Sequence, residues 1–554
     1  MGPIPIASPM PVRARFGRGP VAAALLALSV HCFPAPGPQA GEPDTDLFDG
    51  ATVARLELRL SDASAERLRA DPRRFVPATL VERVDGGEGG EPGEIVHEEV
   101  AVRLKGSAGS FQALDEKPGF TINMDAWHPG RRFHGLDKFH LNNAAQDPTL
   151  LHEWLGGELF RAAGIPAARV GHARLILDGR DLGLYALKEA IDRDFLERSF
   201  DDSSGNLYDG GAGVDLDELT ERDEGRSGPP GADVARLVEA CRTDDAESRP
   251  AAIEERLDVE AFLDFVTMEL LSAHWDGSTI GHNNYRLYFD PAREGRAVFI
   301  PHGMDQILGD PSAPILDMPA TIVAGAVLRV PAWRERFREK LRERIPLFAP
   351  DRLLPAIDGA AERLEPAVAE TGEEAFGAWR DAIADLRARV EARHANLLEQ
   401  AEAPEPEPVS FDGARRAMLG GWHPRDETGG GALDELVQDD GRLVLSIGCS
   451  GEGQTVASWR TALPLPAGRY LFQGLARGEG IDALDDEQGS GAGLRISGGV
   501  RTERVERDGE WTMLGYEFEV EEPRQVELVA ELRARAGRVL FNAESLVLVR
   551  LSDP

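Results

Sequence analysis

Apolar residues in the N-terminal half of the chain follow both strand-like and helix-like patterns. Polar and apolar residues alternate in Arg55-Leu-Glu-Leu-Arg-Leu and in Val102-Arg-Leu-Lys, and a period of two predicts strands. Over residues 150–163 the apolar positions recur at helical spacing. The pair Asp178-Gly179 lies between two apolar runs and predicts a hairpin turn. Together these patterns predict a mixed α+β region.

A second helix and strand pair are predicted further along. Asp258 is a suitable N-cap for a helix that ends near Trp275, and alternation returns at Tyr285-Arg-Leu-Tyr-Phe and at Ala297-Val-Phe-Ile. Before this helix, residues 215–233 are acidic and rich in Gly and Pro, which predicts a loop. We therefore expect candidate chemistry at the junction between the helix and the strand pair.

The sequence pattern after residue 345 changes to amphipathic helices followed by a Pro/Glu run, and this change divides the chain. Amphipathic helices are predicted at residues 333–345, 352–371 and 374–401, and the run Pro404-Glu-Pro-Glu-Pro is typical of a stiff spacer. We place a helical extension at 346–402 and a Pro/Glu linker at 403–410.

Residues 411–554 show short strand-like runs between Gly-rich turns, which predicts an all-β jelly roll or sandwich. The strings Trp459-Arg-Thr and Ala467-Gly-Arg-Tyr resemble the galactose-binding-like jelly rolls of secreted proteins. That resemblance implies a glycan or a protein as the partner of this domain.

The charge of the chain restricts its partners. The 554 residues include 61 Lys+Arg and 96 Asp+Glu, a formal net charge of −35. An acidic surface repels phosphate backbones and anionic lipid headgroups, so we expect no nucleic-acid partner. Divalent cations and basic protein segments are the expected companions. The three cysteines, Cys32, Cys241 and Cys449, exclude a disulfide scaffold and a thiolate zinc site.

The N-terminal residues resemble a secretion signal. Arg13, Arg15 and Arg18 precede an apolar run at residues 21–30, followed by small residues near position 40. We expect residues 1–40 to be a signal peptide and the protein to be exported, to the extracellular space, the cell surface or the periplasm. The alternative is a leader with a chance apolar stretch. We expect no transmembrane segment after the signal.

A set of acidic and amide residues at the predicted junction suggests phosphoryl transfer. Asp276 follows the helix, Asn283 and Asn284 precede the strand pair, and Asp305 follows it. In phosphoryl transfer one carboxylate takes the proton of the hydroxyl group that receives the phosphate, while an amide oxygen and a second carboxylate hold Mg²⁺. The alternative is structural, because Asp and Asn in loops also cap helices and turns.

Lysine is rare in this chain, which otherwise uses Arg. A retained Lys is typical of a site that needs a compact point charge, such as a phosphate contact, although surface Lys residues also occur. The residues concerned are Lys105, Lys117, Lys138, Lys188 and Lys340.

Several strings, in order, resemble the CotH-type spore-coat kinase family. They are Arg103-Leu-Lys-Gly-Ser, Lys117-Pro-Gly-Phe, Leu141-Asn-Asn-Ala-Ala-Gln-Asp-Pro-Thr-Leu-Leu, Gly183-Leu-Tyr-Ala-Leu-Lys-Glu, Gly205-Asn-Leu-Tyr, Asn284-Tyr-Arg-Leu-Tyr and Phe299-Ile-Pro-His-Gly-Met-Asp-Gln. The resemblance implies an atypical, bilobal protein-kinase-like domain at residues 50–345. It also implies that ATP and Mg²⁺ or Mn²⁺ are used to phosphorylate Ser or Thr of secreted or surface proteins.

The resemblance implies a role for each of five residues. Lys117 is similar to the lysine that contacts phosphate, and Glu189 is expected near the nucleotide pocket. Asp276 is similar to the catalytic aspartate, and Asn284 and Asp305 are similar to the metal ligands.

One position departs from the family pattern. Many members carry Trp-Asp-x-Asp where this chain has His302-Gly303-Met304-Asp305, so the first of two acidic positions is Gly. His302 is an alternative ligand or a hydrogen-bonded core residue. The Gly303 substitution favours a second hypothesis, in which the protein is a non-catalytic coat or adhesion protein. Transfer of AMP and formation of an acyl-phosphate are two other reactions that a phosphotransferase-like fold can support.

Overall fold

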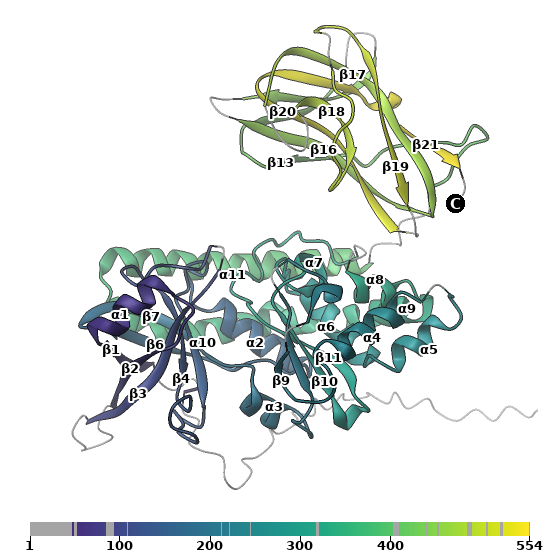
Figure 1. Ribbon diagram of the computed structural model, residues 1–554. Helices are drawn as coiled ribbons and strands as arrows, with labels where there is room; N and C mark the ends of the chain where they lie inside the picture. The colour runs from purple at the N-terminus through teal and green to yellow at the C-terminus, as the bar shows by residue number, and fades with distance from the viewer. Residues whose placement is uncertain are drawn as a thin grey trace, which may run out of the picture. The chain divides into compact units, whose positions relative to one another are not determined.

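The computed structural model describes residues 47–48, 53–84, 93–107, 109–211, 213–220, 222–243, 245–316, 321–402, 409–437, 441–450, 454–484, 490–505, 508–520 and 524–552. The predicted signal peptide, residues 1–40, and residues 403–408 of the predicted linker lie outside the described residues. Mixed α and β structure precedes the linker and all-β structure follows it (Figure 1). Among the described residues, no helix is long and apolar enough to cross a membrane.

A closed barrel forms the first part of the α/β region, in the strand order β1-β2-β3-β4-β5-β7-β6. The strands alternate apolar and polar residues as predicted, and Leu56, Val102 and Phe139 are buried in the barrel core. A parallel pairing of β1 with β6 closes the ring. The strands are Ala54–Leu60 (β1), Val76–Val84 (β2), Gly93–Lys105 (β3), Gly119–Asn123 (β4), Lys138–Asn142 (β5), Val170–Leu177 (β6) and Arg180–Glu189 (β7), with the helix Asp62–Ala70 (α1) between β1 and β2.

Helices and a small antiparallel sheet form the second part. The sheet has the order β11-β10-β8-β9, with strands Asn206–Asp209 (β8), Arg222–Glu224 (β9), Tyr285–Asp290 (β10) and Arg296–Pro301 (β11). Asp258 caps α6 as predicted, since its side chain accepts a hydrogen bond from Ala261 N. The helices are His152–Ala162 (α2), Arg193–Ser199 (α3), Ala232–Cys241 (α4), Arg249–Glu254 (α5), Val259–Leu271 (α6), Ser278–Gly281 (α7), Ile322–Leu328 (α8), Pro331–Arg344 (α9), Pro350–Ala369 (α10) and Glu373–Glu402 (α11).

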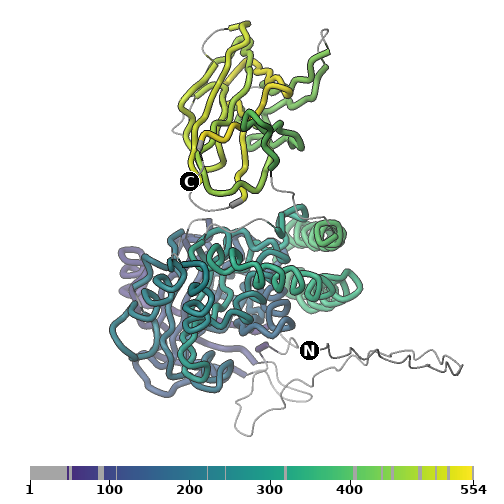
Figure 2. The backbone as a smooth tube through the Cα atoms, turned by 90° about the vertical axis from the view of Figure 1, so that its right-hand side faces the viewer, coloured from purple at the N-terminus to yellow at the C-terminus, as the bar shows by residue number. Residues whose placement is uncertain are grey.

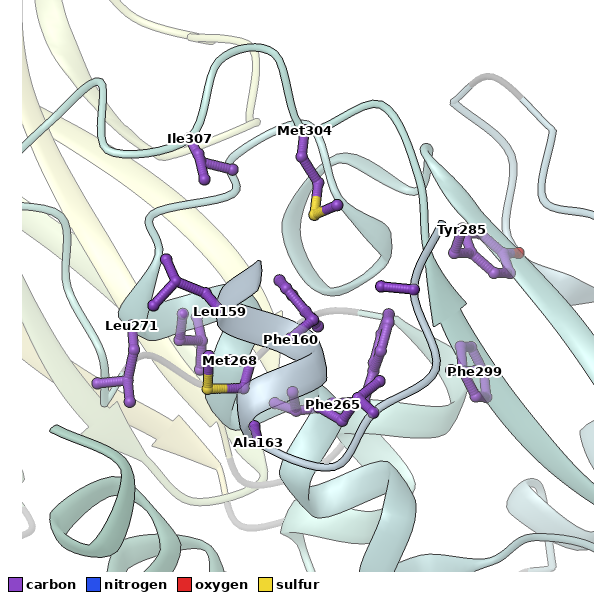
Figure 3. Packing of buried hydrophobic residues seen from close by; sticks show 14 of the residues in the cluster. Leu159, Phe160, Ala163, Phe265, Met268, Leu271, Tyr285, Phe299, Met304 and Ile307 are labelled. Atoms are coloured by element: carbon purple, nitrogen blue, oxygen red, sulfur yellow. The ribbon is translucent and has the colours of Figure 1, made fainter. Parts of the chain in front are cut away.

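One apolar cluster supports the elements that carry the candidate chemistry. Figure 3 shows side chains of α2 and α6 beside those of β10, β11 and the residues that follow β11. The Phe160 and Phe265 rings have centroids 6.2 Å apart, and Phe265 lies 5.4 Å from Phe299. This packing holds α6 against α2 and β11.

The helices after residue 345 share that same core. Leu353, Ile357, Leu386 and Leu397 of α10 and α11 are buried in one cluster with α2 and α6. The expected division at residue 345 therefore separates helices that pack together. The long helix α11 is visible in both views of the molecule (Figures 1 and 2).

Arg393 of α11 donates hydrogen bonds to the carbonyls that end α6. Its guanidinium lies 3.0 Å from Leu271 O and 2.6 Å from Leu270 O, and it also reaches Pro311 O at 3.2 Å and Ala313 O at 2.5 Å. The side chain is buried, and burial lowers its pKa to about 10. Because the last carbonyls of a helix lack partners within it, Arg393 acts as a cap supplied from another helix.

The C-terminal region is a ten-stranded antiparallel sheet. Its long strand β20 pairs with β16 and β18 along its first half and with β15 and β17 along its second half. The strands are Arg416–Met418 (β12), His423–Asp426 (β13), Gly431–Val437 (β14), Leu443–Cys449 (β15), Thr455–Leu465 (β16), Gly468–Ala483 (β17), Gly491–Ile496 (β18), Thr512–Val520 (β19), Arg524–Asn542 (β20) and Val547–Ser552 (β21). This region is all-β, as the Gly-rich turns predict.

The substitution Arg393→Met tests the cap. It removes the guanidinium donor that these four carbonyls share, although Ala313 O keeps the Gln400 amide as a donor, and we expect the free energy of unfolding to fall by about 3 kcal/mol. The measurement is urea unfolding followed by the helical circular dichroism signal. Glu391→Gln, an exposed change on the same helix, is the matched control. Equal stability of the two variants would contradict the role of Arg393.

Candidate active site

A cavity of about 720 Å³ brings together ends of barrel strands and loops of the helical part. Barrel strands contribute Lys105, Asn142 and Lys188, and α2 contributes Glu153. The loop after α6 contributes Asp276, the residues before β10 contribute Asn284, and the loop after β11 contributes Asp305. Its volume is in the range of ordinary ligand sites.

Asp276 is held by two amide side chains. Asn284 Nδ2 donates to Asp276 Oδ2 at 2.7 Å and to its backbone oxygen at 3.0 Å. Asn283 Nδ2 lies 3.2 Å from both carboxylate oxygens. Since these donors are neutral, they orient the carboxylate without cancelling its charge, and the carboxylate remains suited to accept a proton.

Glu269 of α6 fixes the turn that carries Asp276 through hydrogen bonds to the residues that follow it. Its buried carboxylate accepts hydrogen bonds from Ser278 N and Thr279 N, both at 2.8 Å, and from the Thr279 hydroxyl. Burial raises the pKa of Glu269 to about 7, against the effect of these donors. Glu269 therefore caps α7 and sets the position of the preceding turn.

His274 joins this turn to the loop that carries Asp305. Its Nε2 lies 3.0 Å from Gly303 O, and because a carbonyl only accepts, Nε2 carries the proton. Burial lowers the pKa of His274, which keeps the ring neutral. The Asp276 turn and residues 303–305 are thus linked by a direct hydrogen bond.

Asp305 is a largely buried carboxylate in an acidic setting. No hydrogen bond or ion pair to another residue occupies it among the residues that the structure describes. Burial and the neighbouring Glu153 carboxylate raise its pKa to about 6, although Lys188 acts in the opposite direction. A cation beside Asp305 would remove this penalty.

The backbone of Gly303 lies against the side chain of Asn284. A Cβ at position 303 would overlap the Asn284 side-chain oxygen, and Gly303 has a φ of +52°. Both amide hydrogens of Asn284 face Asp276, so this oxygen is the remaining acceptor of the side chain. The glycine therefore leaves room for the Asn284 amide oxygen.

A buried ion pair between Lys188 and Glu153 also lines the cavity. Lys188 Nζ is 2.6 Å from Glu153 Oε2, and both side chains are almost fully buried. The other Glu153 oxygen accepts a hydrogen bond from Met304 N. Burial alone would raise the pKa of Glu153, but the Lys188 ammonium group and its hydrogen bond hold that pKa below its usual value.

Lys105 adds a second ammonium group to the cavity. It donates to the Asn142 side-chain oxygen, and burial together with the charge of Lys188 lowers its pKa to about 8. Two neighbouring ammonium groups in a buried site repel each other, and an anionic ligand relieves that repulsion.

The five residues with predicted roles fall into two groups. Asp276, Asn284 and Asp305 line the cavity together, whereas Lys117 and Glu189 do not line it. Glu189 is buried between Arg169 and Arg198, at 2.9 and 2.7 Å. Lys117 lines a separate cavity.

Sequence reasoning suggested a phosphate contact for Lys105 and Lys188 only as members of the set of rare lysines, and it assigned no role to Glu153. A signal for the two lysines existed, since both are rare lysines within strings that resemble the family. Along β7 adjacent residues face opposite sides, so Lys188 faces the cavity while Glu189 faces the two arginines. Glu153 has no signal in sequence, because its role depends on the approach of α2 to β7.

His302 also lines the cavity. Within the described residues its buried Nδ1 has no hydrogen-bond partner. Burial, reinforced by Lys188 and Arg286, lowers the pKa of His302 well below its usual value. The low pKa keeps the imidazole neutral.

The donor set suits a hard divalent cation. Asp305 supplies an unoccupied carboxylate and Asn284 an amide oxygen, and oxygen ligands are those that Mg²⁺ prefers. In the described part of the chain, no three His, Cys, Asp or Glu side chains form a closed metal cluster. That pattern fits Mg²⁺, which binds one or two carboxylates and takes its remaining ligands from phosphates and water.

Comparison with known proteins places the chain in a family. A family model described as CotH kinase protein matches residues 102–397, more than half of the chain. Invasin CotH2 of Rhizopus delemar is 27% identical over 189 residues, which are 31% of this chain and 32% of that protein. Invasin CotH3 of the same organism is 25% identical, over 31% of each chain. The match thus spans about a third of these relatives.

Two solved structures share weaker similarity. A galactotriose complex of TmCBM61 is 16% identical, covering 24% of this chain and 90% of its own, with a TM-score of 0.17. The HipA–HipB complex with operator DNA from Shewanella oneidensis is 14% identical, covering 63% and 74%, with a TM-score of 0.23. TM-scores this low do not establish a common fold. On the extent of the family-model match, the chain belongs to the CotH kinase protein family.

Proposed function

We propose that this protein is an ATP- and metal-dependent phosphotransferase with a bilobal, protein-kinase-like domain. The observation that carries the proposal is that one cavity is lined by Asp276, Asn284 and Asp305 together with Lys105 and Lys188. Protein kinases combine the same parts, namely a strand lysine paired with a helix glutamate, a catalytic aspartate followed by an asparagine, and a metal-binding aspartate.

The roles of the carboxylates follow from their surroundings. Asp276, oriented by Asn283 and Asn284, accepts the proton of an acceptor hydroxyl as its oxygen attacks the γ-phosphorus of ATP. The new O–P bond forms while the bond between the γ-phosphorus and the β–γ bridging oxygen breaks, and ADP leaves. A divalent cation held by Asp305 and Asn284 would neutralise charge on the phosphates.

The lysines position the phosphates. Lys105 and Lys188 are fixed by Asn142 and Glu153, so they are oriented before the nucleotide arrives. Charges fixed in advance in a buried site stabilise developing negative charge more than mobile charges in water do. This phosphate role, which the sequence suggested for Lys117, is proposed here for Lys105 and Lys188.

The expected acceptors are Ser or Thr hydroxyls of secreted or surface proteins, with Mg²⁺ or Mn²⁺ as the metal. Export remains part of the proposal, and the relatives named invasins are compatible with a surface location.

A second candidate function is non-catalytic attachment to a surface. The names of the invasin relatives and the all-β C-terminal region favour it, with that region binding a glycan or a protein. Under this alternative, Asp305→Asn and the wild type would bind a glycan array equally, and neither would bind ATP.

Asp305→Asn and Lys188→Met test the enzyme. Each removes a charge that acts on the phosphates, and we expect phosphoryl transfer to fall about a hundredfold or more. The measurement is transfer of label from γ-³²P-ATP to the protein itself or to a basic, serine-containing peptide. Label from α-³²P-ATP would instead mark transfer of AMP.

Asp310→Asn is the matched control for Asp305→Asn, because Asp310 is an exposed residue of the same loop whose carboxylate accepts hydrogen bonds from the backbone N–H and the hydroxyl of Ser312. Full activity of Asp305→Asn would contradict the proposed metal ligand. Absence of transfer and of nucleotide binding in the folded wild type would exclude the enzyme.

Gly303→Ala tests the fit between Gly303 and Asn284. The added methyl group displaces the Asn284 side chain from Asp276, and we expect activity to fall about tenfold or more. Gly295→Ala is the control, since Gly295 also has a positive φ, of +76°, but open space around it. If the two variants lose the same activity, backbone strain rather than contact with Asn284 is responsible.

A further inference from the structure

A second cavity, of about 480 Å³, lies outside the candidate active site. It is formed by the start of β7, the turn between α10 and α11, and the loop that precedes α2. The two cavities have Ala144 and Asp147 in common, so they meet across that loop. None of the proposed catalytic roles uses this space.

Apolar side chains supply much of the wall of the second cavity. They come from three separate parts of the chain and are Pro148, Leu150, Leu182, Leu184, Val368 and Trp379. The Trp379 indole is already fixed, since its Nε1 donates to Thr149 O at 3.0 Å. Such a wall favours a ligand with an apolar body.

The charged residues of this cavity are paired, with one exception. Arg174 binds Asp181 and also Glu370, the latter at 2.7 Å. Asp147 accepts hydrogen bonds from Thr149 and from His152, whose Nδ1 lies 2.8 Å away. These carboxylates therefore already have donors.

Lys117 is the exception. In the part of the chain that the structure describes, its ammonium group has no carboxylate within ion-pair distance, and its contact is the Tyr185 ring, with Nζ 5.1 Å from the centroid. Burial lowers the pKa of Lys117 to about 8, and no acidic neighbour offsets that effect. A partly buried ammonium group without a counter-charge carries a desolvation penalty that an anion would relieve.

We propose that this cavity is a second ligand site, which takes a small amphiphilic anion whose apolar body contacts Trp379 and Leu184 and whose anionic group pairs with Lys117. The site is separate from the nucleotide cavity, and the proposal does not depend on phosphotransferase activity.

The probe for this site is 8-anilinonaphthalene-1-sulfonate, an aromatic sulfonate that fluoresces when it leaves water. We expect one saturable site on the full-length protein. Lys117→Met should weaken binding about tenfold or more, which corresponds to about 1.4 kcal/mol, while Lys117→Arg retains most of it. Ala375→Trp, which places a large side chain at an exposed position of the cavity wall, should also weaken it.

Arg67→Met is the matched control, because it removes one positive charge from an exposed position on α1, away from both cavities. Circular dichroism of each variant checks that it folds. Binding to the wild type should weaken above pH 8, where Lys117 loses its charge while the sulfonate keeps its own.

Three results would overturn the proposal. They are the absence of a saturable site, equal affinity in Lys117→Met and the wild type, and displacement of the probe by ATP with Mg²⁺. The last result would assign Lys117 to the nucleotide site, as the sequence suggested. Loss of probe binding in Asp305→Asn would also contradict a separate site.

Discussion

The ion pair between Lys188 and Glu153 joins three parts of the chain on which the candidate site depends. Lys188 belongs to the barrel, Glu153 begins α2, and the second oxygen of Glu153 holds the backbone of Met304, next to Asp305. A buried pair gains little stability overall, because both charges lose their hydration. Its effect here is positional, since it holds the Lys188 ammonium group and the backbone next to Asp305 at the same cavity.

The turn that carries Asp276 is held by a few buried hydrogen bonds. Glu269 fixes the turn that carries Asp276, and His274 links this turn to Gly303. Arg393, from far along the sequence, ties the end of α6 to the segment after Asp305. The chemistry therefore rests on a core that extends to α11, in agreement with a family match that reaches residue 397.

Local patterns predicted much of this arrangement. Alternation located β1 and the end of β3, the Asp258 cap located α6, and the spacing of Asp276, Asn284 and Asp305 around a strand pair placed them at one junction. Partners distant in sequence were not predictable in this way. Glu153 acquires its role through the approach of α2 to β7, and Lys117 lines a different cavity from Asp276, Asn284 and Asp305. In the sequence, Gly303 suggested the loss of an acidic metal ligand. In the structure, the absence of a side chain at Gly303 leaves room for the Asn284 side chain.

The most direct test of the central claim is a crystal structure with Mn²⁺ and a non-hydrolysable ATP analogue, examined by anomalous scattering at the manganese edge. The account predicts a manganese peak bound by Asp305 and Asn284, with the nucleotide phosphates between that metal and Lys105 and Lys188. A nucleotide bound elsewhere, or a fully occupied cavity without a metal at Asp305, would contradict it.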